Sequence, residues 1–468
     1  MDDAKDYNDF AVLLCDKAIR ELVPDLTTYF SYFHAYNQLR FDLVRRLENE
    51  AKGSDLAKPY VLLTRPWGTI DWNEFQESIS SALKVAPNDW VACQLYMLWR
   101  VDIESIASYP EVQTDLETLK ILETKIENDD EFSHFRADLN YIKARGFMQE
   151  GNVKEAKTWF NRAISLAKKH DSLIVLASLL IDKANMIKNV NFNEALSILQ
   201  SQRTISQKLG SIYHLALNDA GSGLIAQARG EYETAIKHLE ECVKYLDPIG
   251  LKSSVDFHRL LIAAQYNQML DGTRALEIVN EVLKEYQSQP PWFPYIQQTW
   301  ALLNLDRVFE ATQCLDLARN WAKKSGRDYT IGYINFLEGL IHKKRSEFPS
   351  AKFELNQAQS YFRTFPSTNQ TLIHLTDVEI EMFPYEKEGI KADISGPWMK
   401  ALDEHIEERD IPGIAAQALL LKAKFRFKQG HAVEAKKLVK KLLKTAETSG
   451  MAYLRTMAES LIPELLVS

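Results

Sequence analysis

The chain has 468 residues, of which 46% are hydrophobic and 26% charged, and its formal net charge is −8. This composition is that of an ordinary folded protein, and the acidic balance argues against a nucleic-acid partner held by a positive field over the whole molecule. No apolar stretch reaches the roughly 18 residues of a membrane-spanning helix, and the acidic start MDDAKDYNDF is unlike a secretion signal, so we expect a cytoplasmic protein without membrane contact.

The first 130 residues have helical spacing of apolar side chains but no repeat. Helices are expected over 7–22, 25–50, 71–85, 88–107 and 111–128, with Pro59 and Pro66 marking a break after the second. This N-terminal helical region, 1–130, is either a separate domain or a set of degenerate hairpins at the end of the array that follows.

From residue 131 onward the sequence repeats. Alanines stand 39, 40, 40, 36 and 40 residues apart, at Ala156, Ala195, Ala235, Ala275, Ala311 and Ala351, and Ala435 follows after 84 more. Twelve residues before five of them stands another small residue, namely Ala144, Gly223, Ala263, Gly339 and Ala423. Paired small residues allow two antiparallel helices to cross closely, and a period of about 40 residues is typical of a solenoid of helical hairpins.

The repeat divides 131–450 into helical hairpins. The regular hairpins are expected over 137–172, 173–211, 212–251, 252–290, 291–327, 328–367 and 411–449. Between the last two lies a less regular hairpin with an irregular insert at 384–396. A final amphipathic helix, 451–466 within the terminal segment 451–468, is expected to cap the last apolar face of the array.

These hairpins resemble tetratricopeptide repeats, with the best match at 212–290. Within that stretch the motif residues are Gly223, Ala235, Leu239, Ala263, Tyr266, Ala275 and Val279. The standard repeat has about 34 residues, whereas the longer version here is similar to that in the sensor arms of maltose-regulator-type activators and in bacterial peptide-receptor regulators. The resemblance implies an all-α, right-handed superhelical solenoid, but it does not specify a function, because the repeat is a scaffold.

In this architecture the first helix of each hairpin lines a concave groove. Projection from the aligned alanines places aromatic, amide and cationic side chains there, a mixture that suits an extended peptide. The alternative is that these side chains belong to the core between hairpins. The candidate partner-binding residues are Tyr141, Arg145, Leu224, Gln227, Phe257, Asn267, Tyr333, Phe336, Lys343, Lys424, Phe427 and Lys428, and the same projection reaches Gln268.

The C-terminal hairpin is strongly basic. Residues 411–450 hold nine lysines and arginines against two acids, a net charge of +7, whereas 381–410 has a net charge of −5. Lys436, Lys440 and Lys444, which we call the basic stripe, share one helix face. The stripe either docks an acidic segment or is neutralised by the neighbouring acidic hairpin, and we favour neutralisation.

Familiar patterns of catalytic and cofactor sites are missing from the sequence. There is no GxxxxGK[ST], GxSxG or HExxH, and the four cysteines stand far apart without a CxxC, which favours reduced, buried thiols. We therefore expect no catalytic residue, cofactor or metal. The leading hypothesis is an interaction scaffold for a peptide or protein, followed by a ligand- or peptide-sensing regulatory protein and by an enzyme with an unrecognised site.

Overall fold

The computed structural model of the chain describes residues 124, 126, 136–149, 152–169, 173–188, 191–248, 252–284, 292–325, 328–362, 367–383, 397–408 and 411–461. The predicted N-terminal region falls outside this set apart from Thr124 and Ile126, and so does the insert 384–396. All regular secondary structure in the described part is α-helix. None of the helices in this part is long and apolar enough to cross a membrane.

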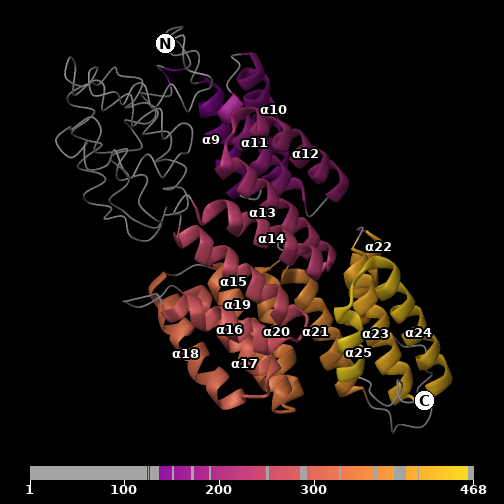
Figure 1. Cartoon of the computed structure of the whole chain (residues 1–468). Coiled ribbons are helices and arrows are strands. Elements are labelled where there is room, and N and C mark those ends of the chain that lie inside the picture. Colours follow the sequence, from indigo (N-terminus) through magenta and orange to yellow (C-terminus); the bar gives the residue numbers. More distant parts are fainter. Residues whose placement is uncertain are drawn as a thin grey trace. The chain divides into compact units, whose positions relative to one another are not determined.

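Consecutive helices pair into hairpins along the chain (Figure 1). The pairs are α9 (Arg136–Gln149) with α10 (Val153–Lys169), α11 (Leu173–Ile187) with α12 (Phe192–Leu209), α13 (Ile212–Arg229) with α14 (Tyr232–Leu246), α15 (Lys252–Gln268) with α16 (Gly272–Lys284), α17 (Trp292–Asn304) with α18 (Val308–Ser325), α19 (Asp328–Lys344) with α20 (Phe348–Tyr361), α21 (Ser367–Met382) with α22 (Pro397–Glu407), and α23 (Pro412–Lys428) with α24 (Ala432–Ser449), before α25 (Tyr453–Leu461). The predicted all-α array of helical hairpins is confirmed for the described residues.

The chain divides into two compact units. The first holds the described residues up to Ile187, together with Glu194–Asn218 and Cys242–Val255. The second holds Lys188–Asn193, Asp219–Glu241 and the described residues from Asp256 onward. Helices α13 and α14 therefore contribute to both units.

Small residues hold the two helices of a hairpin close together. Ala235 of α14 is fully buried, and a Cβ added to Gly223 of α13 would lie 3.2 Å from the Ala235 carbonyl oxygen. In the α19–α20 hairpin, a Cβ on Gly339 would lie 2.7 Å from Cγ of Leu355, and Ala351 is fully buried. These crossings leave no room for a larger side chain, which explains the period of small residues in the sequence.

The turns inside the hairpins use left-handed backbone conformations. Gly230 and Gly430 have φ angles of +77° and +83°, as glycine after a helix commonly does. Three further turns place a non-glycine residue in the same region, namely Leu270 (φ 62°), Asp306 (φ 57°) and Ser346 (φ 61°). The sequence did not point to these three residues, because side chains other than glycine enter this region at a cost.

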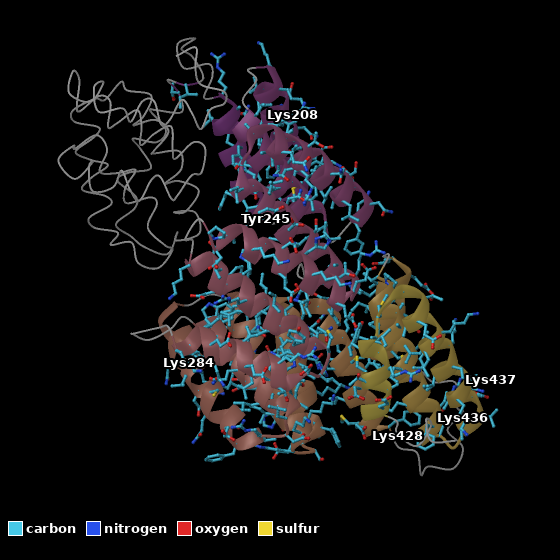
Figure 2. All side chains as sticks on the ribbon, in the orientation of Figure 1. Lys208, Tyr245, Lys284, Lys428, Lys436 and Lys437 are labelled. Carbon is cyan, nitrogen blue, oxygen red and sulfur yellow. The ribbon has the colours of Figure 1, made fainter. Side chains whose placement is uncertain are left out.

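Helix α24 separates an apolar face from a basic one. Its buried residues recur at intervals of three and four, namely Ala435, Val439, Leu442 and Ala446. Most of its lysines occupy the opposite, exposed face, and Figure 2 shows Lys436 and Lys437 projecting from the outer edge of the helix. The apolar face packs on α23 and α25, so the basic face is left to solvent.

The second unit departs from the solenoid rule that each repeat contacts only its neighbours. The turn between α13 and α14 contacts the start of α23, where Gly230 lies against Gly413. A Cβ added to Gly230 would lie 2.8 Å from the carbonyl carbon of Gly413, so the two backbones meet with no side chain between them. We call this contact, with the side chains of Tyr232, Gln370 and Tyr453 around it, the seam.

Buried hydrogen bonds complete the seam. The Tyr453 hydroxyl donates to the Gly230 carbonyl oxygen at 2.7 Å, and Nε2 of Gln370 donates to the Tyr232 hydroxyl at 2.5 Å. The two tyrosine rings pack with their centroids 4.9 Å apart. Burial raises the pKa of both tyrosine hydroxyls, which therefore stay protonated and keep their hydrogen bonds over the physiological pH range.

Replacing Gly413 by alanine should loosen the seam, because the new methyl group must enter a contact between two backbones. Overpacking of this kind typically costs about 1–3 kcal/mol of unfolding free energy. Hydrogen exchange should show faster exchange at the α13–α14 turn, and urea denaturation should show the loss of stability.

The matched control is Gly430→Ala, because no atom lies within 4 Å of the position that its methyl group would take. This variant should lose stability through backbone strain alone, without faster exchange at the α13–α14 turn. If the backbone amides of the α13–α14 turn exchange at the wild-type rate in Gly413→Ala, the seam is not tightly packed.

Candidate functional site

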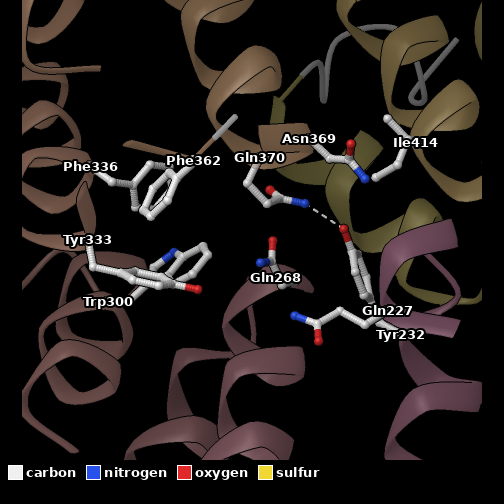
Figure 3. A pocket seen from close by; sticks show the side chains of 10 residues that line it. All are labelled: Gln227, Tyr232, Gln268, Trp300, Tyr333, Phe336, Phe362, Asn369, Gln370 and Ile414. Atoms are coloured by element: carbon white, nitrogen blue, oxygen red, sulfur yellow. Dashed lines mark hydrogen bonds between the residues drawn. The ribbon is translucent and has the colours of Figure 1, made fainter. Parts of the chain in front are cut away.

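The first helices of several hairpins surround a hollow in the second unit. The hollow contains about 380 Å³ of space free of atoms, part of it open to solvent. Two of its wall residues, Tyr232 and Gln370, also belong to the seam. The full lining, drawn in Figure 3, is Gln227, Tyr232, Gln268, Trp300, Tyr333, Phe336, Phe362, Asn369, Gln370 and Ile414.

Aromatic rings form one side of the hollow (Figure 3). The ring centroids of Trp300 and Phe336 are 5.1 Å apart, and those of Tyr333 and Phe362 are 5.0 Å apart, both in edge-to-face arrangements. Trp300, Phe336 and Phe362 are buried, whereas Tyr333 is half-buried. Phe336 therefore serves mainly as a core residue whose ring reaches the hollow, and Tyr333 is the most exposed ring of this wall.

Side-chain amides form the other side. Gln227, Gln268 and Gln370 point toward the middle of the hollow in Figure 3. The Gln370 amide forms a hydrogen bond with the Tyr232 hydroxyl. Gln268 is only 8% exposed, and its Oε1 is buried without a hydrogen-bond partner. An unpaired buried polar atom costs on the order of 1–3 kcal/mol, and a ligand that donates a hydrogen bond to it would remove this cost.

A row of aromatic contacts connects the hollow to an exposed ring. The ring centroid of Tyr333 lies 6.0 Å from that of Trp292, which lies 5.4 Å from Phe293, which in turn lies 5.8 Å from Phe257. Phe257 is 48% exposed. We call these four residues the aromatic row, and all four belong to the first helices α15, α17 and α19.

The sequence predicted only the two ends of the aromatic row. Trp292 and Phe293 were missed because their hairpin, 291–327, has Thr299 rather than a small residue twelve positions before Ala311, so the projection could not be applied there. The local cluster PPWFPY, three prolines among three aromatic residues at the start of a first helix, was the signal that could have identified them.

Three other predicted groove residues of the second unit have mainly structural contacts. Nδ2 of Asn267, a fully buried residue, donates to the Gln297 carbonyl oxygen at 3.1 Å and so ties α15 to α17. Phe427 packs against the apolar core of the last hairpin. Leu224 is half-buried in α13, whereas Gln227, one turn further along, lines the hollow.

Two predicted groove residues lie in the first unit, on α9. The Tyr141 hydroxyl donates to Oδ2 of Asp182 at 2.6 Å and thereby links α9 to α11. Arg145 lies in the helix, but its side chain falls outside the described residues. A role for this pair in partner binding stays a prediction.

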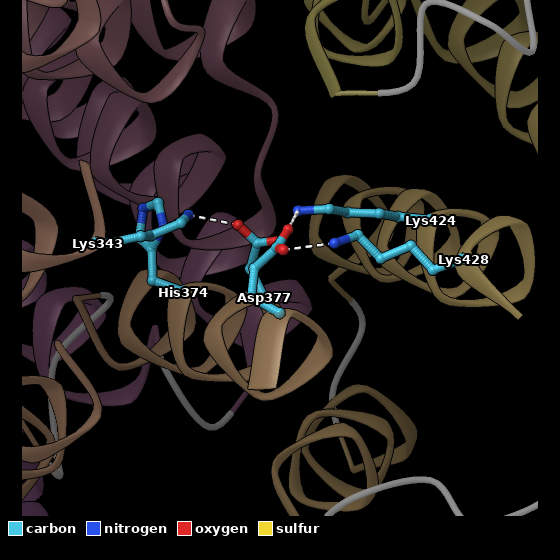
Figure 4. Close-up of polar contacts among 6 residues, drawn as sticks. Lys343, His374, Asp377, Lys424 and Lys428 are labelled. Atoms are coloured by element: carbon cyan, nitrogen blue, oxygen red, sulfur yellow. Dashed lines mark hydrogen bonds and ion pairs between the residues drawn. The ribbon is translucent and has the colours of Figure 1, made fainter. Parts of the chain in front are cut away.

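The predicted groove lysines of the second unit form intramolecular ion pairs (Figure 4). Lys343 and Lys424 both contact the buried Asp377 carboxylate, and Nζ of Lys424 also lies 2.7 Å from Oε1 of Glu381. Lys428 contacts the second oxygen of Glu381. These contacts join α19, α21 and α23, so we leave the three lysines out of the proposed partner-binding surface.

Each charge in this cluster stabilises the charged form of its partners. Burial alone would raise the pKa of the Asp377 carboxyl, but the Lys343 and Lys424 ammonium groups outweigh burial and hold the pKa well below its usual range. Burial, followed by the nearby Lys343, lowers the pKa of His374 to about 3, so its imidazole is neutral near pH 7. The cluster does not line the hollow, and its perturbed pKa values therefore indicate structure rather than catalysis.

The acids near the basic stripe pair with other lysines. In the described part of 381–410, Glu381 contacts Lys424 and Lys428 of α23, and Oδ1 of Asp403 lies 2.7 Å from Nζ of Lys422, also on α23. The neutralisation favoured from the sequence thus operates on α23, the first helix of the hairpin. The basic stripe lies on α24, and its two later lysines are exposed.

No group of three or more potential metal ligands is found among the described residues. Neither Cys242, which is buried, nor Cys314, which is half-buried, forms a disulfide among the described residues, and Cys15 and Cys93 lie outside the described part of the chain. In the first unit, His214 is buried between the hydroxyls of Ser178 and Ser211, at 3.0 and 2.9 Å, and burial lowers its pKa to about 4. We interpret this imidazole as a buried structural group.

Replacing Asp377 by asparagine should destabilise the second unit, because Lys343 loses its carboxylate and the buried Lys424 ammonium group is left near the half-buried ammonium group of Lys343. Breaking a buried ion pair in this way typically costs about 3–5 kcal/mol, which denaturation at pH 7 would measure. The matched control is Asp403→Asn, whose half-exposed pair with Lys422 should contribute at most about 1 kcal/mol.

The effect of Asp377→Asn should also depend on pH. A carboxylate whose pKa is lowered by folding stabilises the protein above the unfolded-state pKa of about 3.9, and this contribution is lost as the pH falls further. The difference in unfolding free energy between the wild type and Asp377→Asn should therefore become smaller as the pH falls below about 4. A gap that stays constant from neutral to strongly acidic pH would show that the Asp377 charge does not stabilise the fold.

Among known proteins, only solved structures were found to be similar to this chain, and the similarity is one of architecture. Neither a protein-family model nor a curated protein sequence matches the chain. Among solved structures, the Rap protein complexed with Competence and Sporulation Factor has a TM-score of 0.45 at 12% identity, over 70% of this chain and 98% of that one. The apo quorum sensor NprR from B. thuringiensis has a TM-score of 0.41 at 11% identity, over 74% of this chain and 97% of that one.

Yeast Tom70 has a TM-score of 0.37 at 12% identity, over 94% of this chain and 96% of that one. At these values the similarities assign neither a partner nor an activity to this chain. The described helices themselves, with their paired small residues and left-handed turns, show a repeat of helical hairpins.

Proposed function

We propose that the chain is a non-enzymatic interaction protein that holds a peptide or protein partner against the first helices of its second unit. The observation that carries this proposal is the hollow together with the aromatic row that leads to it. Aromatic side chains supply large contact areas, and a few amides in an otherwise apolar site orient what is bound.

The exposure of the aromatic row gives the partner a route across the surface. Phe257 is the most exposed of the four rings, and Trp292, Phe293 and Tyr333 are half-buried. An extended segment that covers Phe257 and continues along the row arrives at the hollow, where Gln268 offers a hydrogen-bond acceptor. Side chains would thus enter apolar surroundings while the backbone finds polar partners, as peptide recognition requires.

A second candidate function is that of a ligand- or peptide-sensing regulatory protein. The observation that favours it is the position of the hollow beside the seam, because Tyr232 and Gln370 belong to both. An occupant that binds more tightly when the Gly230–Gly413 contact is formed would shift the second unit toward the conformation that has this contact. In either role the protein acts in the cytoplasm, where thiols such as Cys242 and Cys314 stay reduced.

Replacing both Phe257 and Tyr333 by alanine should weaken partner binding, since both ends of the aromatic row are lost. Removal of anchoring aromatic residues commonly costs about 2 kcal/mol or more, which is roughly a 30-fold increase in Kd. The partner would be isolated by affinity capture, identified by mass spectrometry and purified, and its Kd would be measured by calorimetry.

The matched control removes two exposed aromatic rings from second helices. Phe309 on α18 is 75% exposed and Phe353 on α20 is 60% exposed. Replacing both by alanine should leave the Kd unchanged. If both double variants weaken partner binding equally, or if the Phe257 and Tyr333 variant does not weaken it at all, binding along the first helices is refuted.

The basic stripe supports a separate prediction about an acidic partner segment. Changing Lys436, Lys440 and Lys444 to glutamate should abolish binding of that segment, because the charge of the docking face is reversed. The fold should survive, since substitutions on a solvated face usually change stability by about 0.5 kcal/mol or less. Wild-type affinity should fall as salt rises, because exposed charges are screened over about 10 Å at 0.1 M.

Thermal melts and binding at two salt concentrations, performed on this one triple variant, separate docking from neutralisation. If the triple variant melts at a much lower temperature but still binds its partner at low temperature, the lysines of the stripe serve to neutralise the acidic hairpin. A stable variant that no longer binds would support docking.

A further inference from the structure

We propose that the hollow receives one uncharged, apolar side chain of the partner together with the peptide group next to it. This inference rests on the proposed function, because it states which part of a partner enters the second unit. It follows from three features of the hollow: the absence of charge in its lining, the aromatic wall, and the amide that has no hydrogen-bond partner.

The lining selects against a charged occupant. Its ten side chains are aromatic, amide or aliphatic, and none carries a charge. The nearby lysines Lys343 and Lys424 are already paired with Asp377, so they do not supply a counter-charge to the hollow. A charged group that leaves water needs a partner of opposite sign, and the lining offers none.

The aromatic wall favours an apolar side chain. Tyr333 is half-buried at the wall and packs edge-to-face on Phe362, while Trp300 packs edge-to-face on Phe336. The hollow's 380 Å³ includes space open to solvent, so the part that its walls enclose is smaller and suits a single side chain better than a whole small-molecule ligand.

The unpaired amide calls for a peptide group. Oε1 of Gln268 is buried, points into the hollow and accepts no hydrogen bond. A glutamine amide has both an acceptor and donors, and a peptide group has one N–H and one C=O, so the two are complementary. A backbone N–H from the occupant can therefore donate to Gln268, and the half-buried amide of Gln227 lies on the same side to bind the carbonyl.

The other two amides of the lining have partners within the protein. Nε2 of Gln370 donates to the Tyr232 hydroxyl at 2.5 Å, and Nδ2 of Asn369 donates to the Ala228 carbonyl oxygen at 3.0 Å. Both hydrogen bonds hold the elements around the seam together. Recognition of the occupant therefore falls to Gln268 and Gln227, and the side chain enters between them and the aromatic wall.

Four small probes test the proposal on the full chain, with ligand-observed NMR as the readout. N-acetyl-phenylalanine amide has the apolar side chain and two neutral peptide groups, and it should bind most tightly. N-acetyl-phenylalanine, which carries a carboxylate at pH 7, and N-acetyl-lysine amide, which carries an ammonium group, should each bind at least about fivefold more weakly. Toluene has the ring without peptide groups and should also bind more weakly.

Gln268→Met tests the amide, because methionine has a similar size but does not donate or accept strong hydrogen bonds. This variant should bind N-acetyl-phenylalanine amide about tenfold more weakly, as expected for one lost hydrogen bond, while its affinity for toluene stays unchanged. The matched control is Gln298→Met, also on a first helix but outside the lining, which should bind all four probes as the wild type does.

Each outcome decides the proposal. Equal or tighter binding of either charged probe, unchanged binding by Gln268→Met, or no binding of N-acetyl-phenylalanine amide would overturn it. The proposed function is tested separately by the Phe257 and Tyr333 double variant. If the probes fail while that variant still loses its purified partner, only the assignment of the occupant is wrong, and if that variant binds normally the proposed function itself is wrong.

Discussion

The backbone contact between Gly230 and Gly413 is the constraint on which the second unit depends. A side chain at either position would force the α13–α14 turn away from α23, and the buried hydrogen bonds of Tyr453 and Gln370 would then be lost. Because a buried polar group without a partner is unfavourable, contact and hydrogen bonds support one another. Together they hold in place segments of the hollow wall that are far apart in the sequence.

The buried charges around Asp377 have a comparable role at another place in the same unit. Lys343, Asp377 and Lys424 come from three successive first helices, and the carboxylate is shared between two ammonium groups. Such a cluster costs desolvation energy, but once formed it strongly disfavours any arrangement that separates the charges. Among the described parts of the second unit, the hollow, the aromatic row and the basic stripe are therefore the surfaces that we propose for partner binding.

The candidate site could be predicted only in part from the sequence. Gln227, Tyr333 and Phe336 were projected into the groove and do line the hollow, because each lies on a first helix whose small residues set the register. Trp292 was missed because Thr299 stands where its hairpin should have a small residue, and Asn369 was missed because the hairpin with the insert 384–396 departs from the regular spacing. Lysines were assigned to a partner because a sequence pattern does not reveal an opposite charge on a neighbouring helix.

For the described hairpins, the sequence by itself determined the helices, their pairing and the small residues at most crossings. These features depend on helical periodicity and on contacts within about 40 residues, which are local. Only the tertiary structure decided that Gly230 meets Gly413, that Lys424 pairs with Asp377 and that Gln268 keeps an unpaired oxygen in the hollow. Those contacts depend on small angles between successive hairpins, which add up along the repeat and leave no local pattern in the sequence.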